Sequence, residues 1–191
     1  MRPDFRRCEA AAKQLLLQQT LTSAWIDVRA LQFDKTVLFD SFQHYCELTG
    51  MSPGTGPASL RDGCTLIRGT THLVLYHDGE RKRDRLNFTL AHEVGHIYLG
   101  HRTDGDIQEV EANFFAAELL MPESVVRYMI RRNHGARAED LHEWFYVTLT
   151  AAQKRLQTLR RKGGFSPTAA DREILRRFLP YLSADDPPVF A

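Results

Sequence analysis

The sequence lacks the features of several protein classes. Within its 191 residues no apolar run approaches the roughly 20 residues that span a bilayer. The first five residues lead into charged residues rather than into the apolar stretch of a signal peptide. The net charge is only +1, from 25 Lys and Arg against 24 Asp and Glu, so no global excess of positive charge favours nucleic acid as the main ligand. We therefore expect a cytoplasmic protein without a membrane span.

Cysteine is also scarce. The chain contains Cys8, Cys46 and Cys64, which are odd in number and widely spaced, and no C-x-x-C pair occurs. This pattern disfavours both a disulfide framework and a zinc site built from cysteines. We predict that all three are reduced, buried thiols. The sequence also contains no internal repeat and no low-complexity segment.

The overall composition is that of an ordinary globular protein. Hydrophobic residues make up 43% and charged residues 26%, which suits a soluble domain with a real core. Hydrophobic periodicity predicts a strand near residues 37–39 and a hairpin formed by 64–67 and 73–76. The predicted helices comprise residues 5–20, 41–49, 87–99, 108–120, 123–133, 138–146, 149–162 and 168–182. Residues 50–63 are rich in glycine and proline and are predicted to form a loop that lines a site.

The predicted helix 87–99 contains the string HEVGH at residues 92–96. On a helix, His92 and His96 lie one turn apart on the same face, so both imidazoles can reach one metal ion. A catalytic zinc site uses three protein ligands and a water, and the Glu after the first His can accept a proton from that water. We therefore predict His92 and His96 as ligands of Zn²⁺ and Glu93 as the catalytic base.

The alternative is a helix with two histidines that are merely packed or solvated, because H-E-x-x-H strings also occur by chance. The residues that flank the histidines are uncharged, as in a helix buried on both sides. Asn87 is a candidate N-cap and Gly100 a candidate C-cap. These features favour the metal site.

The third ligand is not given by the motif. In the metzincin pattern H-E-x-x-H-x-x-G-x-x-H, both Gly100 and His101 miss the register by one place, so we interpret His101 as a loop or surface histidine. The predicted helix 108–120 offers carboxylates instead. Glu109 shares one face with Asn113, whereas Glu111 lies on the opposite face together with Glu118, where we expect solvent.

We therefore predict Glu109 as the third ligand, with Glu111 as the fallback. Asn113, one turn further on, is predicted to orient one of the metal ligands by a hydrogen bond without binding the metal itself. The small Ala112 and Ala116 would let the two helices approach closely. The alternative for Glu109 is an ordinary acidic residue at a helix N-terminus, where the helix dipole favours it.

Together, residues 87–96 (NFTLAHEVGH) and 109–122 (EVEANFFAAELLMP) resemble the ImmA/IrrE family of zinc peptidases. That family carries an F-T-L-A-H-E-x-G-H helix followed by E-x-x-A-N-x-F-A-A-x-L-L-M-P. The resemblance covers about residues 64–122 well, extends weakly into 143–156, and does not include residues 1–60.

The resemblance implies a cytoplasmic, gluzincin-like zinc peptidase from a bacterium or a mobile element. It implies that the substrate is typically a helix-turn-helix repressor, which we expect here to be a separate protein. The expected fold class is α+β: a mostly helical zincin-like domain over residues 1–125, with the hairpin near 64–77 packed on the HExxH helix. A helical subdomain over 126–191 would pack on it, with a disordered tail at 184–191.

Several alternatives remain open at this stage. Tyr98, Tyr128 and His134 are weak candidates for an oxyanion donor, and none is assigned. Residues 139–162 have the outline of a helix-turn-helix with basic residues on the second helix, although packing helices with a solvated basic face explain it as well. A regulator that keeps zinc without peptidase activity is a further alternative, which the presence of Glu93 disfavours. The oligomeric state is open.

Overall fold

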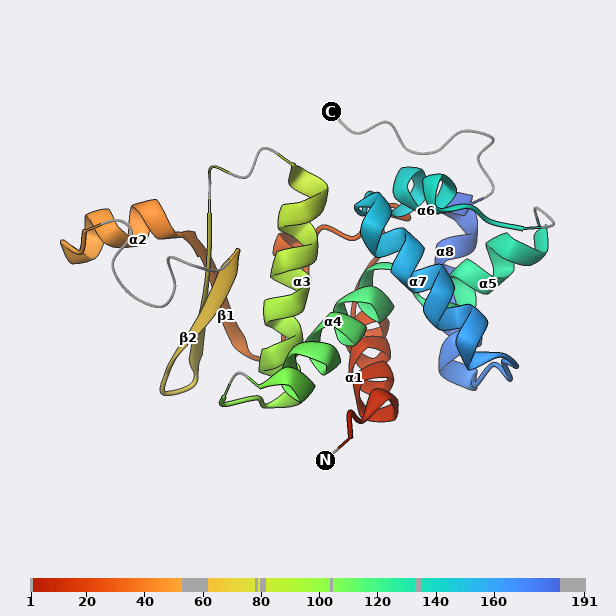
Figure 1. Ribbon diagram of the computed structural model, residues 1–191, viewed down its shortest axis with the longest axis horizontal. Helices are drawn as coiled ribbons and strands as arrows, with labels where there is room; N and C mark the ends of the chain where they lie inside the picture. The colour runs from red at the N-terminus through yellow and green to blue at the C-terminus, as the bar shows by residue number, and fades with distance from the viewer. Residues whose placement is uncertain are drawn as a thin grey trace.

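The computed structural model describes residues 2–52, 62–77, 79, 82–103, 105–132 and 135–182. The fold is α+β and mostly helical, as predicted (Figure 1). Its α-helices are α1 Phe5–Leu17, α2 Phe42–Thr49, α3 Arg83–Leu99, α4 Asp106–Leu120, α5 Glu123–Arg132, α6 Ala138–Phe145, α7 Leu149–Lys162 and α8 Ala169–Leu182, with a short 3-10 helix, η1, at Val28–Ala30. The strands are β1 Thr36–Ser41, β2 Gly63–Arg68 and β3 Thr71–Tyr76. The predicted tail, His134 and most of the predicted 50–63 loop lie outside the described residues.

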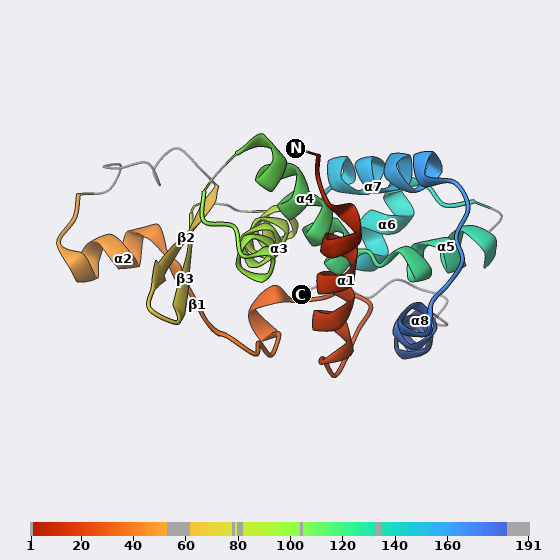
Figure 2. The same cartoon turned by 90° about the horizontal axis from the view of Figure 1, so that it is seen from below.

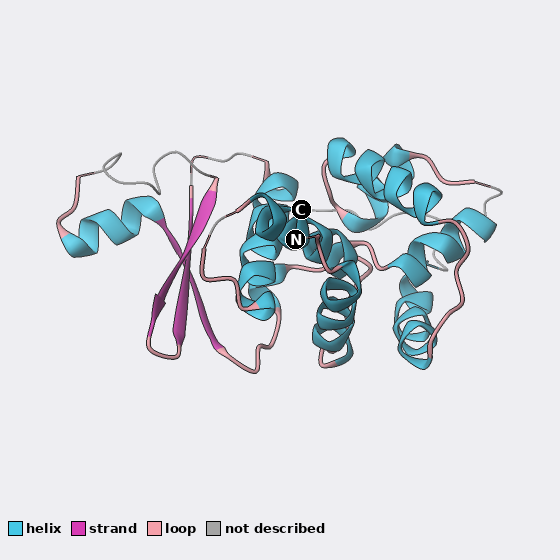
Figure 3. Ribbon diagram, turned by 60° about the horizontal axis from the view of Figure 1, so that its bottom comes forward, coloured by secondary structure: helices cyan, strands magenta, loops and turns pink. Residues whose placement is uncertain are grey.

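The three strands form one small sheet at one end of the molecule (Figure 3). The strand order is β1-β3-β2, with β1 parallel and β2 antiparallel to β3. The predicted hairpin is therefore confirmed, with Cys64 opposite Leu75 in its register. Because β3 is central, β2 lies at an edge of the sheet, and its first residues lie against α3.

Helix α3 lies between the sheet and the helices α1 and α4 (Figures 1 and 2). This burial on both sides agrees with the uncharged residues around the motif. The helix ends as predicted at Gly100, whose φ of +65° is the left-handed conformation that glycine adopts without strain.

The predicted N-cap of this helix was wrong. The helix begins at Arg83, and Asn87 lies inside its first turns with only 5% exposure. The Asn87 side chain accepts a hydrogen bond from the Val28 amide at 3.0 Å and donates one to the Ile26 carbonyl at 2.8 Å. Asn87 therefore satisfies buried backbone groups of the neighbouring 26–28 segment, a long-range role that looks identical to a cap in the sequence.

Helix α4 is buried on more than the expected face. Glu111 and Glu118, predicted to face solvent, are 7% and 0% exposed. The reason is that α1 packs beside α4, and the Asp4 amide donates to Glu111 at 2.7 Å. Arg155 of α7 reaches Glu118 from the other direction. The carboxylates are satisfied by partners that are distant in sequence.

The C-terminal helices α5 to α8 lie on the side of α4 away from the sheet (Figure 1). The division of the chain near residue 125 stays a prediction. Within the helix-turn-helix outline, Arg155 is 2% exposed and paired with Glu118, so it is not available to a phosphate backbone. Lys154, Arg160 and Arg161 are exposed, as a solvated basic face requires. Leu149, at the start of the same helix, is 44% exposed.

The cysteine prediction is confirmed in part. Cys8, Cys46 and Cys64 are all free, but only Cys8 is buried and the other two are half-buried. Burial, together with the negative charges of Glu111 and Asp4, raises the pKa of the Cys8 thiol to about 12. Over the part of the chain that the structure describes, no helix combines the length and apolarity needed to cross a membrane.

A largely buried ion-pair cluster joins α1 to α8. The Lys13 ammonium of α1 lies 2.5 Å from a Glu9 oxygen and 2.7 Å from an Asp171 oxygen of α8. Burial alone would raise the pKa of each carboxyl group, but the hydrogen bonds with lysine outweigh it for Glu9 and, with those from Thr168, for Asp171. Both pKa values are therefore lowered, from 4.5 and 3.8.

We expect this cluster to make stability depend on acid pH. A lowered folded-state pKa gives stability that is present above the unfolded pKa and lost as the pH falls through the folded value. The free energy of unfolding should thus decline below about pH 4. Lys13→Met should flatten this decline, and Lys154→Met, at an exposed lysine, should not. Urea unfolding at a series of pH values measures both, and equal pH profiles for the two variants would refute the assignment.

Candidate metal centre

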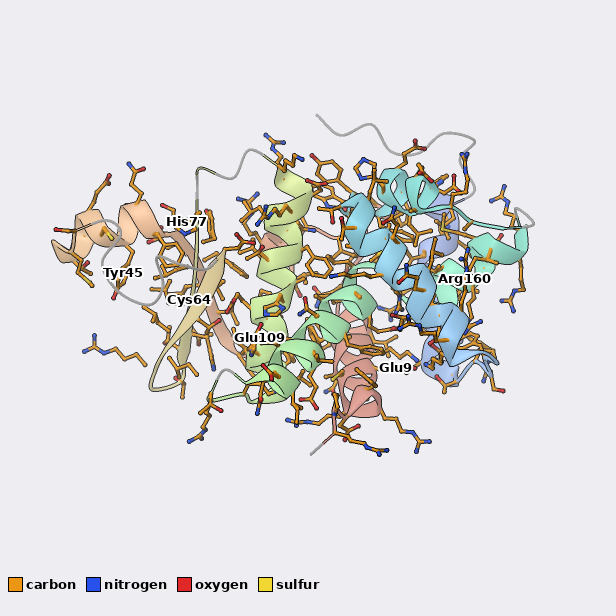
Figure 4. The ribbon with its side chains drawn as sticks, in the orientation of Figure 1. Glu9, Tyr45, Cys64, His77, Glu109 and Arg160 are labelled. Carbon is orange, nitrogen blue, oxygen red and sulfur yellow. The ribbon has the colours of Figure 1, made fainter. Side chains whose placement is uncertain are left out.

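Two histidines of α3 and one carboxylate of α4 converge where the helices cross. The Nε2 atoms of His92 and His96 are 3.0 Å apart. Glu109 places one oxygen 3.3 Å from His92 Nε2 and the other 3.6 Å from His96 Nε2. Figure 4 labels Glu109 at this crossing. Of the residues that the structure describes, these three form the group of His, Cys, Asp and Glu side chains that could hold a metal ion.

The separations fit tetrahedral zinc. Ligand bonds of about 2.0–2.1 Å at a tetrahedral angle put neighbouring ligand atoms about 3.3 Å apart. The histidine nitrogens are 3.0 Å apart, and each lies near a different oxygen of Glu109, at 3.3 and 3.6 Å, so all three distances are close to that value. Three protein donors leave one position of a tetrahedron for water or substrate, which distinguishes a catalytic site from a closed structural one. The side chains predicted from the motif and from the second helix are thus brought together.

Small residues let the two helices approach closely enough for this. A Cβ atom built on Gly95 would lie 3.2 Å from both the Cα and the carbonyl oxygen of Ala112, and 3.1 Å from a ring carbon of Phe115. A larger residue at position 95 would push α4 away, and Glu109 with it. The small residues of the two motifs therefore set the distance between the histidines and the carboxylate.

Glu93 lies beside the histidines but is not part of the candidate ligand group of His92, His96 and Glu109. It is 8% exposed, and its Oε2 accepts a hydrogen bond from the Thr65 hydroxyl of β2 at 2.7 Å. The edge strand comes this close because Gly63 has no side chain: a Cβ there would lie 2.8 Å from Thr89 and 3.5 Å from Glu93. One carboxylate oxygen is thus held by the sheet. The strand contributes an orienting group that the motif itself does not contain.

His101 was predicted to be a loop or surface histidine; it does lie in the loop after α3, but its side chain is not at the surface. Its side chain is 7% exposed, its Nδ1 lies 3.0 Å from His96 Nδ1, and its Nε2 lies 3.0 Å from Glu111 Oε2. The left-handed Gly100 turns the chain back over the helix, and the His101 amide donates to the His96 carbonyl at 3.0 Å. A histidine directly after a helix-ending glycine was the signal in the sequence that could have located it.

One assignment of protons satisfies this chain of contacts. His101 donates from Nε2 to the Glu111 carboxylate and accepts at Nδ1 from the Nδ1–H of His96. That leaves the Nε2 lone pair of His96 directed at the site formed with Glu109. A carboxylate and an imidazole behind a ligating histidine fix its tautomer and ring orientation. Glu111, the predicted fallback ligand, contacts His101 instead of joining the group formed by His92, His96 and Glu109.

We therefore predict that His101→Ala weakens zinc binding by about 10- to 100-fold, because His96 loses the partner that holds its ring. Competition with a chromogenic chelator measures the affinity without any substrate. His44→Ala is the matched control. His44 is more than half exposed, and it pairs with Asp40 rather than with any residue of the metal centre. Equal affinities for both variants and the unmodified protein would contradict this role.

Asn113 lies close to the site but contacts the backbone. Its Nδ2 donates to the Glu109 carbonyl at 2.7 Å, one helical turn back. With His92, Glu93 and Glu109 it lines a cavity of about 560 Å³. Orientation of a ligand by Asn113 stays a prediction, and the contact seen is with the main chain of Glu109 rather than with its carboxylate.

The two described tyrosines that were weak oxyanion candidates have other contacts. The Tyr98 hydroxyl donates to Asp34 at 2.7 Å, and burial together with this carboxylate raises the pKa of Tyr98 above its ordinary value. Tyr128 is partly buried and packs against the hydrophobic core. Neither residue lines the cavity at the histidines.

A comparison with known families identifies the chain. The family Peptidase_M78, described as the IrrE N-terminal-like domain, matches residues 58–157. The chain belongs to this family. No curated protein matches the chain. The Peptidase_M78 match begins ahead of β2 and extends into α7, so it includes His92, Glu93, His96 and Glu109. It also includes His101 and Glu111, and the resemblance carried by the two sequence motifs is confirmed.

Proposed function

We propose that this Peptidase_M78 member is a zinc-dependent endopeptidase that hydrolyses a peptide bond in a protein substrate. The observation that carries the proposal is the convergence of His92, His96 and Glu109 at tetrahedral distances beside the buried carboxylate of Glu93. A structural zinc site does not need a buried carboxylate that lies beside its ligands without being one of them. The open cavity of about 560 Å³ gives a substrate access to it.

The residues divide the chemistry between them. His92, His96 and Glu109 would hold Zn²⁺, which when bound supplies a Lewis acid that polarises the peptide carbonyl and lowers the pKa of water. Glu93 accepts the proton of the attacking water and passes it to the amine nitrogen of the leaving peptide. The Thr65 hydroxyl donates to one Glu93 oxygen and so orients the carboxylate beside the histidines. Water adds to the carbonyl carbon, and the C–N bond breaks.

The substrate and the location rest on the family resemblance. We propose a helix-turn-helix repressor of a phage, mobile element or stress regulon as the substrate, and the cytoplasm as the compartment. The three free cysteines support a reducing compartment. A regulator without peptidase activity is the alternative, and the oriented, buried Glu93 favours the enzyme over it.

Metal removal and reloading tests the proposal. The protein is stripped with a chelator, reloaded with one equivalent of Zn²⁺, and incubated with a peptide library prepared from a bacterial proteome. We expect cleavage in the zinc-loaded sample alone, and none from His96→Ala, which should also fail to retain zinc. A repressor encoded beside the gene is then tested as the individual substrate. Cleavage that persists without metal, or zinc-loaded protein that cuts nothing, would overturn the proposal.

A further inference from the structure

A second, larger cavity adjoins the one at the histidines. It has a volume of about 770 Å³ and lies between α4 and α7. Both cavities are lined by Asp62, Phe88, Thr89 and Asn113, so they form one continuous groove that begins at the metal centre. We call the larger cavity the α4–α7 groove. Anything that occupies it is contiguous with the position where a peptide bond would be cleaved.

The floor of the α4–α7 groove is apolar. Phe88 of α3, Phe114 and Val110 of α4 and Phe5 of α1 line it. The rings of Phe5 and Phe114 pack at a centroid distance of 4.8 Å. Phe5 and Val110 are each 43% exposed, and exposed apolar side chains that gather in one concave place indicate a binding surface. The groove therefore offers an apolar surface to a side chain of a ligand.

The outer wall of the groove is basic. Lys154 and Arg161 of α7 and Arg6 of α1 line it and are exposed. Among the described residues, no carboxylate lies within ion-pair distance of these three cations. The acidic groups that line the groove are already paired, Glu9 with Lys13 and Lys162, and Asp62 with Arg85. The groove thus presents positive charge that the protein itself does not neutralise.

We propose that the α4–α7 groove is the specificity site of the peptidase, and that it binds an acidic-apolar segment of the substrate next to the cleaved bond. The segment would place an apolar side chain on the floor formed by Phe88, Phe114 and Val110, and Asp or Glu side chains against Lys154 and Arg161. The proposal rests on the proposed function, because continuity with the metal centre makes the occupant part of the substrate. The apolar floor favours a polypeptide over a nucleic acid, whose phosphates would meet the basic wall alone.

Peptide selection tests this without requiring cleavage. Zinc-loaded Glu93→Gln protein, which should bind and not cut, is used to select from a displayed library of random 12-residue peptides. We expect enrichment of peptides that combine Asp or Glu with Leu, Ile or Phe. Selected peptides should bind Lys154→Glu/Arg161→Glu protein at least roughly tenfold more weakly, since two attractive contacts become repulsive. Added salt should reduce this difference.

The matched control is Arg160→Glu. Arg160 is exposed on the same helix and is labelled in Figure 4, but it does not line the groove. This variant should bind the selected peptides like the parent protein. Selection without acidic enrichment, equal weakening by Arg160→Glu, or binding of an unrelated DNA duplex that displaces the peptides would overturn the inference. Failure of the proposed function is separate: it would appear as absent cleavage by zinc-loaded wild-type protein, whatever the peptide selection shows.

Discussion

Glu93→Gln is expected to lower the cleavage rate by about 10²- to 10⁴-fold, the usual contribution of a general base, while zinc binding stays unchanged. Glutamine has the shape of glutamate but cannot accept the proton of the attacking water. Thr65 can still donate its hydrogen bond to the amide oxygen, so the local structure should be kept. The measurement is the single-turnover rate on a peptide identified in the proteome library, with metal content determined on the same samples.

Thr65→Val provides the matched comparison for this prediction. It removes the hydroxyl that orients Glu93 but leaves the carboxylate, so its rate should fall by much less than that of Glu93→Gln. Both variants should retain one zinc ion per chain, because neither residue belongs to the ligand group of His92, His96 and Glu109. Unchanged cleavage by zinc-loaded Glu93→Gln would show that Glu93 does not act as the base, and loss of its zinc would show that Glu93 contributes to metal binding.

Arg155→Met is expected to destabilise the protein strongly, by about 3–5 kcal/mol. The side chains of Arg155 and Glu118 are 1% and 0% exposed, and they are paired directly. Arg155 also donates to the Met121 carbonyl at 2.9 Å. Removal of the guanidinium leaves the Glu118 carboxylate charged and buried without its partner, although the Glu123 amide still donates to it at 3.1 Å.

Denaturant unfolding at neutral pH measures this loss. Arg160→Met is the control, because Arg160 is an exposed arginine of the same helix, and it should change the free energy of unfolding by less than about 0.5 kcal/mol. The double variant Arg155→Met/Glu118→Gln should recover part of the loss, since no unpaired charge is then buried. Equal stability of Arg155→Met and Arg160→Met would show that the pair contributes nothing to holding α7 on α4.

Several features of this protein could be predicted from short stretches of sequence. Helix α3 and its end at Gly100 follow from local periodicity and from a glycine that can adopt positive φ. The β2–β3 hairpin follows from two apolar runs on either side of a glycine turn. These features depend on residues close together in the chain, which is why the pattern alone was sufficient.

The errors share a different origin. Asn87 and Glu111 were each assigned from their own neighbourhood in the sequence, as a cap and as a solvated acid. Each is buried because a partner from elsewhere reaches it: the 26–28 segment reaches Asn87, and the N-terminal residues at α1 reach Glu111. A single sequence does not reveal such partners. A polar residue whose hydrogen bonds are made to a distant group looks the same in the sequence as one that is hydrogen-bonded to water.

The same distinction between local and distant contacts applies to the metal centre. The sequence by itself determined that His92 and His96 share one helix face with Glu93 beside them, because helical periodicity leaves them no other arrangement. Only the tertiary structure decided that Glu109 meets both histidines, since that depends on the close crossing at Gly95 and Ala112. It also decided that Thr65 and His101 support the site and that a basic, apolar groove leads away from it, because these arise where separate elements pack together.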